Sequence, residues 1–462
     1  MPMINLINAF LNSRYPIIIL TVVALITRFA FLSYPAEVVF DEVYFGKFVS
    51  AYFDRQYYFD IHPPLGKLII AGLAALSGFK PGFDFSHIGE GFDAQYLFIL
   101  RFLPALFSSF FPLVIYLLLM QLGATRKTAF LGAFLTVFDN AVLGQSKFIL
   151  LDIFLLFFGF LSLHLFLKSQ KAVSTLKSYL FLAAAATSAI FSASIKWTGL
   201  SFLALLFLMA LLEALKRSNI KKFFLQIAIL LIVPFIIYCL VFLTHFSLLS
   251  NSGSGDAYMS YSFQQSLKGI GNMSFWQKFS ELNKAMYQYN VGLKATHAYG
   301  SKWYQWPLDA RPIWYWTKTQ DGNVGNIYLF ANPLTAWLVL IGVIIGTLSI
   351  FIKNIRKKLP PLFYILLLGY FGNLLPYLAI TRVAFLYHYL PSLVFGILML
   401  AILYEKIIAP KLSPKNDLLT YGAMLSGSLL FFILFAPLTY GFLIPINSSL
   451  NHFYNFFITL LS

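Results

Sequence analysis

Charged residues are scarce in this chain of 462 residues: Asp, Glu, Lys and Arg together make up 11% of it, whereas hydrophobic residues make up 59%. A soluble globular domain typically carries about 25% charged residues. The composition therefore excludes an ordinary soluble domain and predicts a protein that is embedded in a membrane over most of its length.

Cysteine is also almost absent. The single cysteine, Cys239, lies inside an apolar run, so it cannot form an intramolecular disulfide and its expected role is packing. The sequence contains no CxxC, HExxH, P-loop or Rossmann glycine pattern. Spacing thus indicates no metal or nucleotide site, and we expect neither a metal nor another cofactor.

What the chain does have is a series of long apolar stretches. A membrane-spanning helix needs about 20 apolar residues. We interpret eleven stretches as such helices: 15–34, 95–121, 128–145, 148–167, 178–195, 197–215, 223–245, 333–352, 360–380, 383–404 and 418–444. The shorter segment 64–78 is interpreted as a re-entrant or surface helix, and no cleavable signal peptide is expected. The sequence predicts an all-α polytopic membrane protein with about eleven transmembrane helices, in one domain over residues 1–462.

Lys and Arg placement predicts the orientation of these helices. If the N-terminus is cytoplasmic, every short loop on that side is basic, as the positive-inside rule requires. The residues concerned are Arg126, Lys127, Lys168, Lys171, Lys177, Lys216, Arg217, Lys221, Lys222, Lys353, Arg356, Lys357, Lys358, Lys406, Lys411 and Lys415. The loops 35–94 and 246–332 and the C-terminus then lie outside a cell membrane. Because these charges are spread over separate loops, the net charge of +16 indicates orientation and attraction to anionic lipid rather than a nucleic-acid partner.

An acidic pair, Asp41 and Glu42, comes directly after the first predicted helix. A solvated interfacial turn is the ordinary reading of such a pair. Here the apolar surroundings favour a functional one, because a partly desolvated carboxylate is a stronger base and can take a proton from an attacking hydroxyl. Adjacent loop residues point in different directions, so we predict Asp41 as the general base and Glu42 as a positioning group.

Two arginines are placed near the outer ends of predicted helices. Arg28 lies inside the first and Arg101 early in the second. Snorkelling to lipid headgroups is one explanation for both. The alternative is that they pair with the acidic loop or hold an anionic phosphate, which the fork of an arginine binds through two oxygens.

Asp60 and His62 stand two residues apart, just before Pro63-Pro64. The prolines exclude a helix and favour an extended conformation, in which residues two apart point to the same side. A lone histidine is more often structural than catalytic. The acid–imidazole pair nevertheless indicates a group that orients a sugar hydroxyl or a leaving phosphate.

The loop 246–332 contains cations among aromatic residues: His297, Lys302 and Arg311 are interleaved with several Trp and Tyr residues. An interfacial aromatic belt would explain the Trp and Tyr residues but not the cations. A sugar-phosphate site would need both, and we leave the two readings equal at this point. Further polar residues at the outward ends of helices are Asp139, Lys147, Asp152, Lys196, Arg382 and His388. Their clustering at one face predicts a single external cavity.

Taken together in order, these motifs resemble the protein O-mannosyltransferase family, polytopic enzymes that use a polyprenyl-phosphate-linked mannose and act on Ser or Thr hydroxyls of proteins. The resemblance extends over nearly the whole chain. The matching segments are 40–46 (FDEVYFG), 60–67 (DIHPPLGK), 83–85 (FDF), 101–105 (RFLPA), 139–140 (DN), 148–152 (FILLD), 194–200 (SIKWTGL), the Trp-rich loop and 388–391 (HYLP).

The resemblance implies the GT-C fold class with an outward-facing active site. Asp41 occupies the position of the family's proposed base, and Arg28 and Arg101 match its functionally important arginines. One departure matters: eukaryotic members carry a large β-trefoil MIR domain between the seventh and eighth helices, and the loop 246–332 is too short to hold it. The chain therefore resembles a prokaryotic-type member.

We thus expect an inverting, metal-independent transferase that moves mannose from a polyprenyl-phosphate carrier to secreted or membrane proteins. Asp41 would deprotonate the acceptor hydroxyl, and Arg311, Lys302 and Arg101 are candidates to stabilise the departing phosphate. A related GT-C enzyme with another lipid-phosphate sugar, or with a lipid or glycan acceptor, remains an alternative. A transporter is a remote one, because it would predict inverted repeats and broken helices near the membrane midplane.

Overall fold

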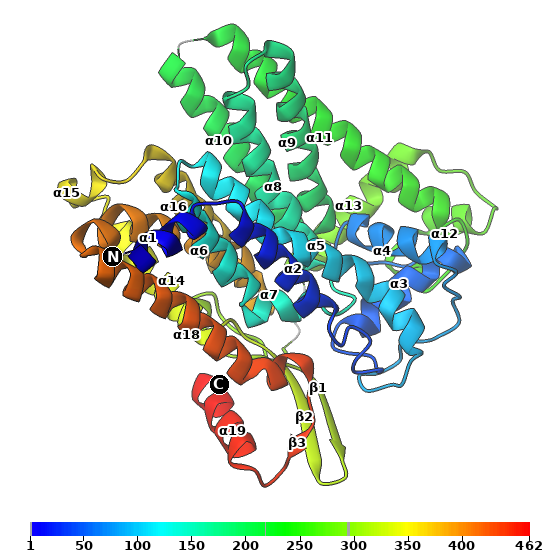
Figure 1. The fold of residues 1–462 in the computed structure, drawn as a ribbon. Coiled ribbons are helices and arrows are strands. Elements are labelled where there is room, and N and C mark those ends of the chain that lie inside the picture. Colours follow the sequence, from blue (N-terminus) through cyan, green and yellow to red (C-terminus); the bar gives the residue numbers. More distant parts are fainter. Residues whose placement is uncertain (1, 218, 293–295) are drawn as a thin grey trace.

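The computed structural model describes residues 2–217, 219–292 and 296–462. Most of them lie in helices that form one bundle, from which a small sheet projects at the end opposite α10 (Figure 1). Within these ranges, eight helical stretches are long and apolar enough to cross a membrane. Their helices are α5 (Ala94–Gln121), α8 (Asp152–Gln170), α9 (Thr175–Ile195), α10 (Leu200–Arg217), α11 (Ile220–Leu248), α16 (Pro361–Leu374), α17 (Leu390–Leu403) and α18 (Pro414–Tyr440).

The remaining helices are shorter. They are α1 (Pro2–Leu11), α2 (Tyr15–Phe29), α3 (Glu42–Asp54), α4 (Leu65–Leu76), α6 (Arg126–Val137), α7 (Asn140–Gly144), α12 (Tyr261–Leu267), α13 (Phe275–Gly292), α14 (Pro333–Leu348), α15 (Lys353–Arg356) and α19 (Ser449–Leu461). The helical fold class is thereby confirmed, whereas the number of membrane crossings stays a prediction.

Three of the eleven predicted spans differ from the helices observed. The spans 15–34 and 333–352 correspond to the shorter α2 and α14. The span 128–145 is broken into α6 and α7, because the Asp139 side chain accepts a hydrogen bond from the Val142 N–H at 2.9 Å and so starts a new helix. The hydrophobic pattern alone could not show that a polar residue inside this apolar run caps a new helix.

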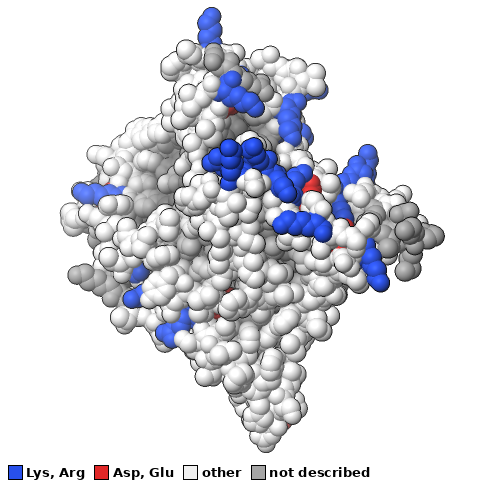
Figure 2. Space-filling model, turned by 90° about the vertical axis from the view of Figure 1, so that its left-hand side faces the viewer, with Lys and Arg blue, Asp and Glu red and all other residues white. Residues whose placement is uncertain are grey.

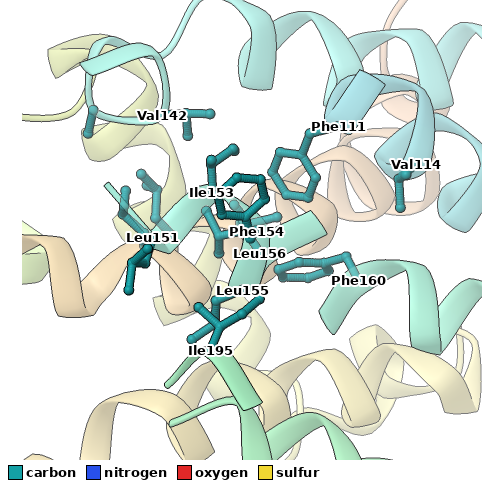
Figure 3. Close-up of a cluster of buried hydrophobic side chains, with 14 of the residues drawn as sticks. Phe111, Val114, Val142, Leu151, Ile153, Phe154, Leu155, Leu156, Phe160 and Ile195 are labelled. Atoms are coloured by element: carbon teal, nitrogen blue, oxygen red, sulfur yellow. The ribbon is translucent and has the colours of Figure 1, made fainter. Parts of the chain in front are cut away.

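The core of the bundle lies around the first half of α8. Ile153, Phe154, Leu155, Leu156 and Phe160 are buried there. Phe111 and Val114 of α5 approach them from one side, and Leu151 and Ile195 lie on another (Figure 3). In a membrane such close packing stabilises the bundle through van der Waals contacts rather than through burial from water. This dense packing holds the start of α8 and the end of α9 in place. Two polar residues of the site, Asp152 and Lys196, lie at these helix ends.

One buried group of hydrogen bonds between the two halves of the chain is centred on Asp139 and Asn332. Asp139 accepts the Asn332 N–H at 3.0 Å, and the Asn332 side-chain amide donates to the Phe138 and Ser428 carbonyls at 2.9 and 2.8 Å. Asn332 also caps α14. Both Asp139 and Asn332 are fully buried. We call this the Asp139–Asn332 clasp.

In its described residues, 246–292 and 296–332, the predicted loop 246–332 consists largely of regular secondary structure. Besides α12 and α13, it contains an antiparallel hairpin of β1 (Ile313–Gln320) and β2 (Asn323–Leu329). A short β3 (Ile444–Pro445) completes a sheet of order β1-β2-β3. Asp321 and Gly322 form the hairpin turn with φ of 48° and 72°, the backbone of a type I′ turn. The sequence analysis did not predict this sheet.

Basic side chains are distributed unevenly over the surface. In the view of Figure 2 most Lys and Arg side chains lie over the upper half of the molecule, and the projecting lower tip is almost free of them. This asymmetry agrees with the loop charges from which the orientation was predicted.

Candidate active site

The acidic motif forms a tight turn that is held against β1. Phe40 has a left-handed backbone with φ of 48°, and α3 begins immediately after Asp41. The Phe40 N–H donates to the Tyr315 carbonyl at 3.2 Å, and the two rings stack with centroids 4.0 Å apart. The turn therefore presents Asp41 and Glu42 to different sides, as the sequence analysis expected of adjacent loop residues.

Glu42 faces inward and binds Arg101. The Arg101 Nε and Nη2 donate to the two Glu42 carboxylate oxygens at 2.8 and 2.7 Å, and both side chains are completely buried. The other Arg101 N–H groups donate to the carbonyls of Leu32, Pro35 and Glu37. All five guanidinium donors are thus engaged. These contacts favour the alternative in which Arg101 pairs with the acidic loop, and they leave no N–H for a phosphate.

Arg28 is buried as well, but in a different place. It donates to Ser108 Oγ at 3.3 Å, to Thr27 Oγ1 at 2.8 Å and to the Thr136 carbonyl at 3.4 Å. Its side chain has no exposed surface, so it does not snorkel to headgroups. These contacts join α2 to α5 and α6, and they give no support to the predicted phosphate contact of Arg28.

Asp41 has different neighbours: Lys196, Asp152 and Asp60 are the charged groups that act on its carboxylate. Its side chain is half-buried and caps no N–H of α3, and among the residues that the structure describes its carboxylate has no hydrogen bond. Burial raises the pKa of Asp41 to about 7; Lys196 opposes the rise, and Asp152 and Asp60 add to it. A carboxylate that titrates near neutral pH is suited to accept a proton from a hydroxyl.

A second acidic residue beside Asp41 is already paired. Asp152, at the first position of α8, accepts two hydrogen bonds from the Lys196 ammonium at 2.9 and 2.8 Å. Lys196 follows the end of α9 and lies 4.9 Å from the centre of the Tyr387 ring. The sequence analysis counted Asp152 and Lys196 among the outward polar groups but gave them no role. Their position at the ends of two apolar helices was the available signal.

Asp60 and His62 lie near Asp41, but not as the predicted acid–imidazole pair. The Asp60 carboxylate binds the Lys67 ammonium and accepts the His62 backbone N–H at 3.2 Å. Lys67 also donates to the His62 carbonyl at 2.9 Å. Lys67, in the first turn of α4, thus pairs with the Asp60 carboxylate, and the role of Asp60 and His62 in orienting a sugar hydroxyl or a leaving phosphate stays a prediction. Burial, together with Lys196, Lys67, Arg382 and His388, depresses the pKa of His62 well below its usual range, so its imidazole is neutral.

A cavity of about 660 Å³ opens between the segments 296–311 and 377–384. Its lining includes His297, Lys302, Arg311 and Arg382, with Trp303 and Tyr304 as aromatic neighbours. Three predicted phosphate-binding residues are therefore brought together in one cavity. Arg311 is partly engaged, since it donates to the Ser462 and Ala298 carbonyls at 3.0 and 3.5 Å.

Arg382 connects this cavity to the Asp41 side of the site. The charges of Arg382 and Lys196 both lower the pKa of His62. His388, another predicted site residue, stacks on Tyr387 with ring centroids 4.5 Å apart, and its Nδ1 lies 3.1 Å from the Phe385 N–H. Only Nε2 of His388 is left for a ligand. Across the described ranges, no group of three or more His, Cys, Asp or Glu residues is arranged to hold a metal ion.

The architecture has close structural parallels. The Saccharomyces cerevisiae protein O-mannosyltransferase Pmt1-Pmt2 complex bound to the sugar donor superposes with a TM-score of 0.85 at 21% identity, over 94% of this chain and 91% of that one. The Archaeoglobus fulgidus oligosaccharyltransferase in the apo form aligns with a TM-score of 0.53 at 12% identity, over 97% of this chain and 60% of that one. The fold is therefore that of the GT-C class.

Sequence comparison defines the family within this class. The model of dolichyl-phosphate-mannose-protein mannosyltransferase matches residues 18–250, and that of the C-terminal four TMM region of protein-O-mannosyltransferase matches residues 275–454. The chain belongs to the protein O-mannosyltransferase family.

Relatives from animals and fungi agree. Protein O-mannosyltransferase 1 of Drosophila melanogaster is 34% identical over 68% of this chain and 36% of its own length. Dolichyl-phosphate-mannose--protein mannosyltransferase 1 of Saccharomyces cerevisiae is 33% identical over 56% of this chain and 33% of its own length. In these two alignments the chain spans about a third of the relative's length.

Proposed function

We propose that this protein transfers mannose from a polyprenyl-phosphate carrier to Ser and Thr hydroxyls of proteins. The observation that carries the proposal is the Asp41 carboxylate: it is partly exposed, it has no hydrogen bond among the described residues, and it lies near the Lys196 ammonium. Membership of a family whose relatives are named for dolichyl-phosphate-mannose and protein acceptors supports the choice of substrates.

Asp41 is the general base in this proposal. It accepts the proton of the acceptor hydroxyl while the hydroxyl oxygen bonds to the anomeric carbon of mannose. The bond between that carbon and the phosphate oxygen breaks, and the polyprenyl phosphate leaves with the electron pair. A single displacement of this kind inverts the anomeric configuration. A base with a pKa of about 7 is partly deprotonated at neutral pH and still basic enough to help.

The departing phosphate needs positive charge in a partly desolvated place. Lys302 and Arg382 line the outer cavity, and neither side chain has a hydrogen bond among the described residues; Arg311 lines it too but is partly occupied. Lys196 carries a further charge close to Asp41. We assign the phosphate to this group and leave Arg101 and Glu42 as positioning residues for the turn. Because Asp60 and Asp152, the carboxylates near Asp41, are each paired with a lysine, we propose that transfer is independent of a divalent metal.

We further propose that the site faces the outside of a cell membrane, with a cytoplasmic N-terminus and an external C-terminus. The support is the basic character of the loops at one end of the bundle (Figure 2). Cysteine scanning in a Cys239→Ser background tests this orientation. Residues in 50–60 and 246–332 should react with an impermeant maleimide on intact cells, and positions near 170, 219 and 356 only after permeabilisation. External labelling of 168–177 would reverse the topology.

Product analysis tests the reaction itself. The purified protein is mixed with radiolabelled polyprenyl-phosphate-mannose and a Ser/Thr-rich peptide, with Asp41→Asn as the matched control. We expect label in the peptide, attached through a β-eliminable O-linkage, and none with the control. Label that passes instead to a lipid or glycan acceptor, or transfer only from a donor with another sugar, would replace the proposal by a related GT-C activity.

A further inference from the structure

The strand β1 forms an open edge of the projecting sheet. The strand order is β1-β2-β3, so β1 pairs with β2 on one side only. In Figure 1 the hairpin extends away from the helical bundle with β1 on its outer edge. An open edge is a template for another extended chain.

The register of the hairpin shows which groups face this edge. The two-residue turn Asp321-Gly322 makes Gln320 and Asn323 the hydrogen-bonded pair that closes the hairpin. Hydrogen-bonded and non-hydrogen-bonded pairs alternate along an antiparallel ladder. Thr319 and Thr317 therefore direct their N–H and C=O groups away from β2. Both residues are exposed, and neither has a further backbone partner among the described residues.

The same edge leads to the active site. At Tyr315, two residues before Thr317, the edge carbonyl is occupied by the Phe40 N–H at 3.2 Å. Asp41 follows Phe40 directly, and its charge acts on the Tyr315 phenol. Because a strand rises about 3.4 Å per residue, Thr317 lies roughly 7 Å along the edge from the point where the catalytic turn is attached. A chain laid along Thr317 and Thr319 therefore continues toward Asp41.

We propose that the acceptor protein segment binds as an added strand on this edge, through the main-chain groups of Thr317 and Thr319. The inference rests on the proposed function, since it names the binding mode of that acceptor. Main-chain pairing holds an extended segment with little regard to its side chains. It thereby allows one site to accept many Ser/Thr-containing segments, whose small polar residues favour disorder in the free state. Lys318 does not obstruct the edge, because its ammonium is held by Glu37 at 2.6 Å.

A backbone N-methyl scan of the acceptor peptide tests this binding mode on the unaltered enzyme. Each peptide carries one N-methyl group at successive positions flanking a single Ser. In an added strand every second N–H faces β1, so kcat/KM should fall about 3- to 10-fold at alternate positions and change little at those between. Equal effects at neighbouring positions, or none beyond the residues next to Ser, would overturn the added strand. Failure of the unmethylated peptide to accept mannose would instead overturn the proposed function.

Two variants at one residue provide the matching test on the enzyme. Thr319→Pro removes the N–H that faces the edge but no bond to β2, and Thr319→Val keeps that N–H and changes only the side chain. We expect the proline variant to raise the peptide KM about 3- to 10-fold with kcat and donor KM unchanged. The alternation in the N-methyl scan should persist, because it reports peptide N–H groups that donate to the edge carbonyls, which proline retains. The valine variant should behave as the unaltered protein. A proline variant with unchanged peptide KM contradicts the inference.

Discussion

Two regions meet at the turn formed by Phe40, Asp41 and Glu42, and they handle charge in opposite ways. Behind the turn, Glu42 and Arg101 are fully buried, and every guanidinium N–H is engaged. In front of it, Asp41 is half-buried, its carboxylate has no hydrogen bond to any residue that the structure describes, and it lies near the Asp152–Lys196 pair. Burial and the saturation of hydrogen bonds, not residue type, distinguish these two neighbouring acidic residues. Glu42 has a structural role, and Asp41 is the residue proposed for the chemistry.

The same contrast separates the cations. Arg28 and Arg101 are completely buried, and each guanidinium connects helices or loops. Lys302 and Arg382 line a cavity that is open to a ligand. Saturated cations stabilise the scaffold, whereas the open ones are available to an anionic substrate. Four experiments test how sharp this division is.

The largest effect is expected from Asp41→Asn, in the front region. The change is nearly isosteric and removes basicity alone, so transfer should fall by about 10²- to 10⁴-fold while donor binding and thermal stability stay close to those of the parent. Single-turnover assays in detergent measure the loss. Turnover at the parental rate would remove Asp41 from the chemistry.

Arg101→Met probes the rear region and should act on stability. Leaving Glu42 buried without its partner costs about 3–5 kcal/mol of unfolding free energy. Denaturant unfolding of the detergent-solubilised protein measures the change. The double variant Arg101→Met with Glu42→Leu should regain part of the loss, because no buried charge then remains unpaired. A single variant as stable as the parent would contradict the structural role.

Lys196→Met should shift the pH dependence of transfer. The base must be deprotonated, so the parental kcat/KM should fall as the pH drops below about 7, the pKa to which burial raises Asp41. Lys196 opposes that rise, so its removal should raise the pKa further, move the acid limb to higher pH and lower activity at pH 7 by about 3- to 10-fold. Lys302→Met is the control: it should weaken donor binding without moving the limb. An unshifted limb in Lys196→Met would show that Lys196 does not act on the base.

The smallest effect is expected from chelation. Treatment with EDTA should leave transfer unchanged, because Asp60 and Asp152 in the front region are paired with lysines, and further cations line the cavity proposed for the phosphate. Activity is compared before and after dialysis against the chelator, with added Mg²⁺ and Mn²⁺ as controls. A loss that a divalent ion restores would mean that Asp41 joins Asp60 or Asp152 around a metal.

Sequence patterns sufficed for the helical class and for the acidic turn, because apolar runs and misplaced carboxylates are local signals. They also selected Lys302 and Arg311, which share a cavity. What they could not supply was pairing across long separations. Arg101 contacts Glu42 from 59 positions away, and Asp152 contacts Lys196 from 44. Pairing was also missed over a short separation. Asp60 binds Lys67, and this could not be predicted without knowing where the first turn of α4 places the Lys67 side chain. The hairpin was not predicted because its aromatic residues were interpreted only as an interfacial belt or as part of a sugar-phosphate site, not as residues of strands.

The Asp139–Asn332 clasp has a consequence for the order of biosynthesis. Asn332 follows Asp139 by 193 residues, which a ribosome adds in roughly 10–40 s. During that interval the amino-terminal helices are already made, yet one of their buried carboxylate oxygens still lacks its partner. The first half of the protein therefore lies in the membrane without the Asp139–Asn332 hydrogen bond until Asn332 and α14 have been synthesised. Chains interrupted before Asn332 should be preferred substrates for membrane quality control, although they contain the whole acidic turn.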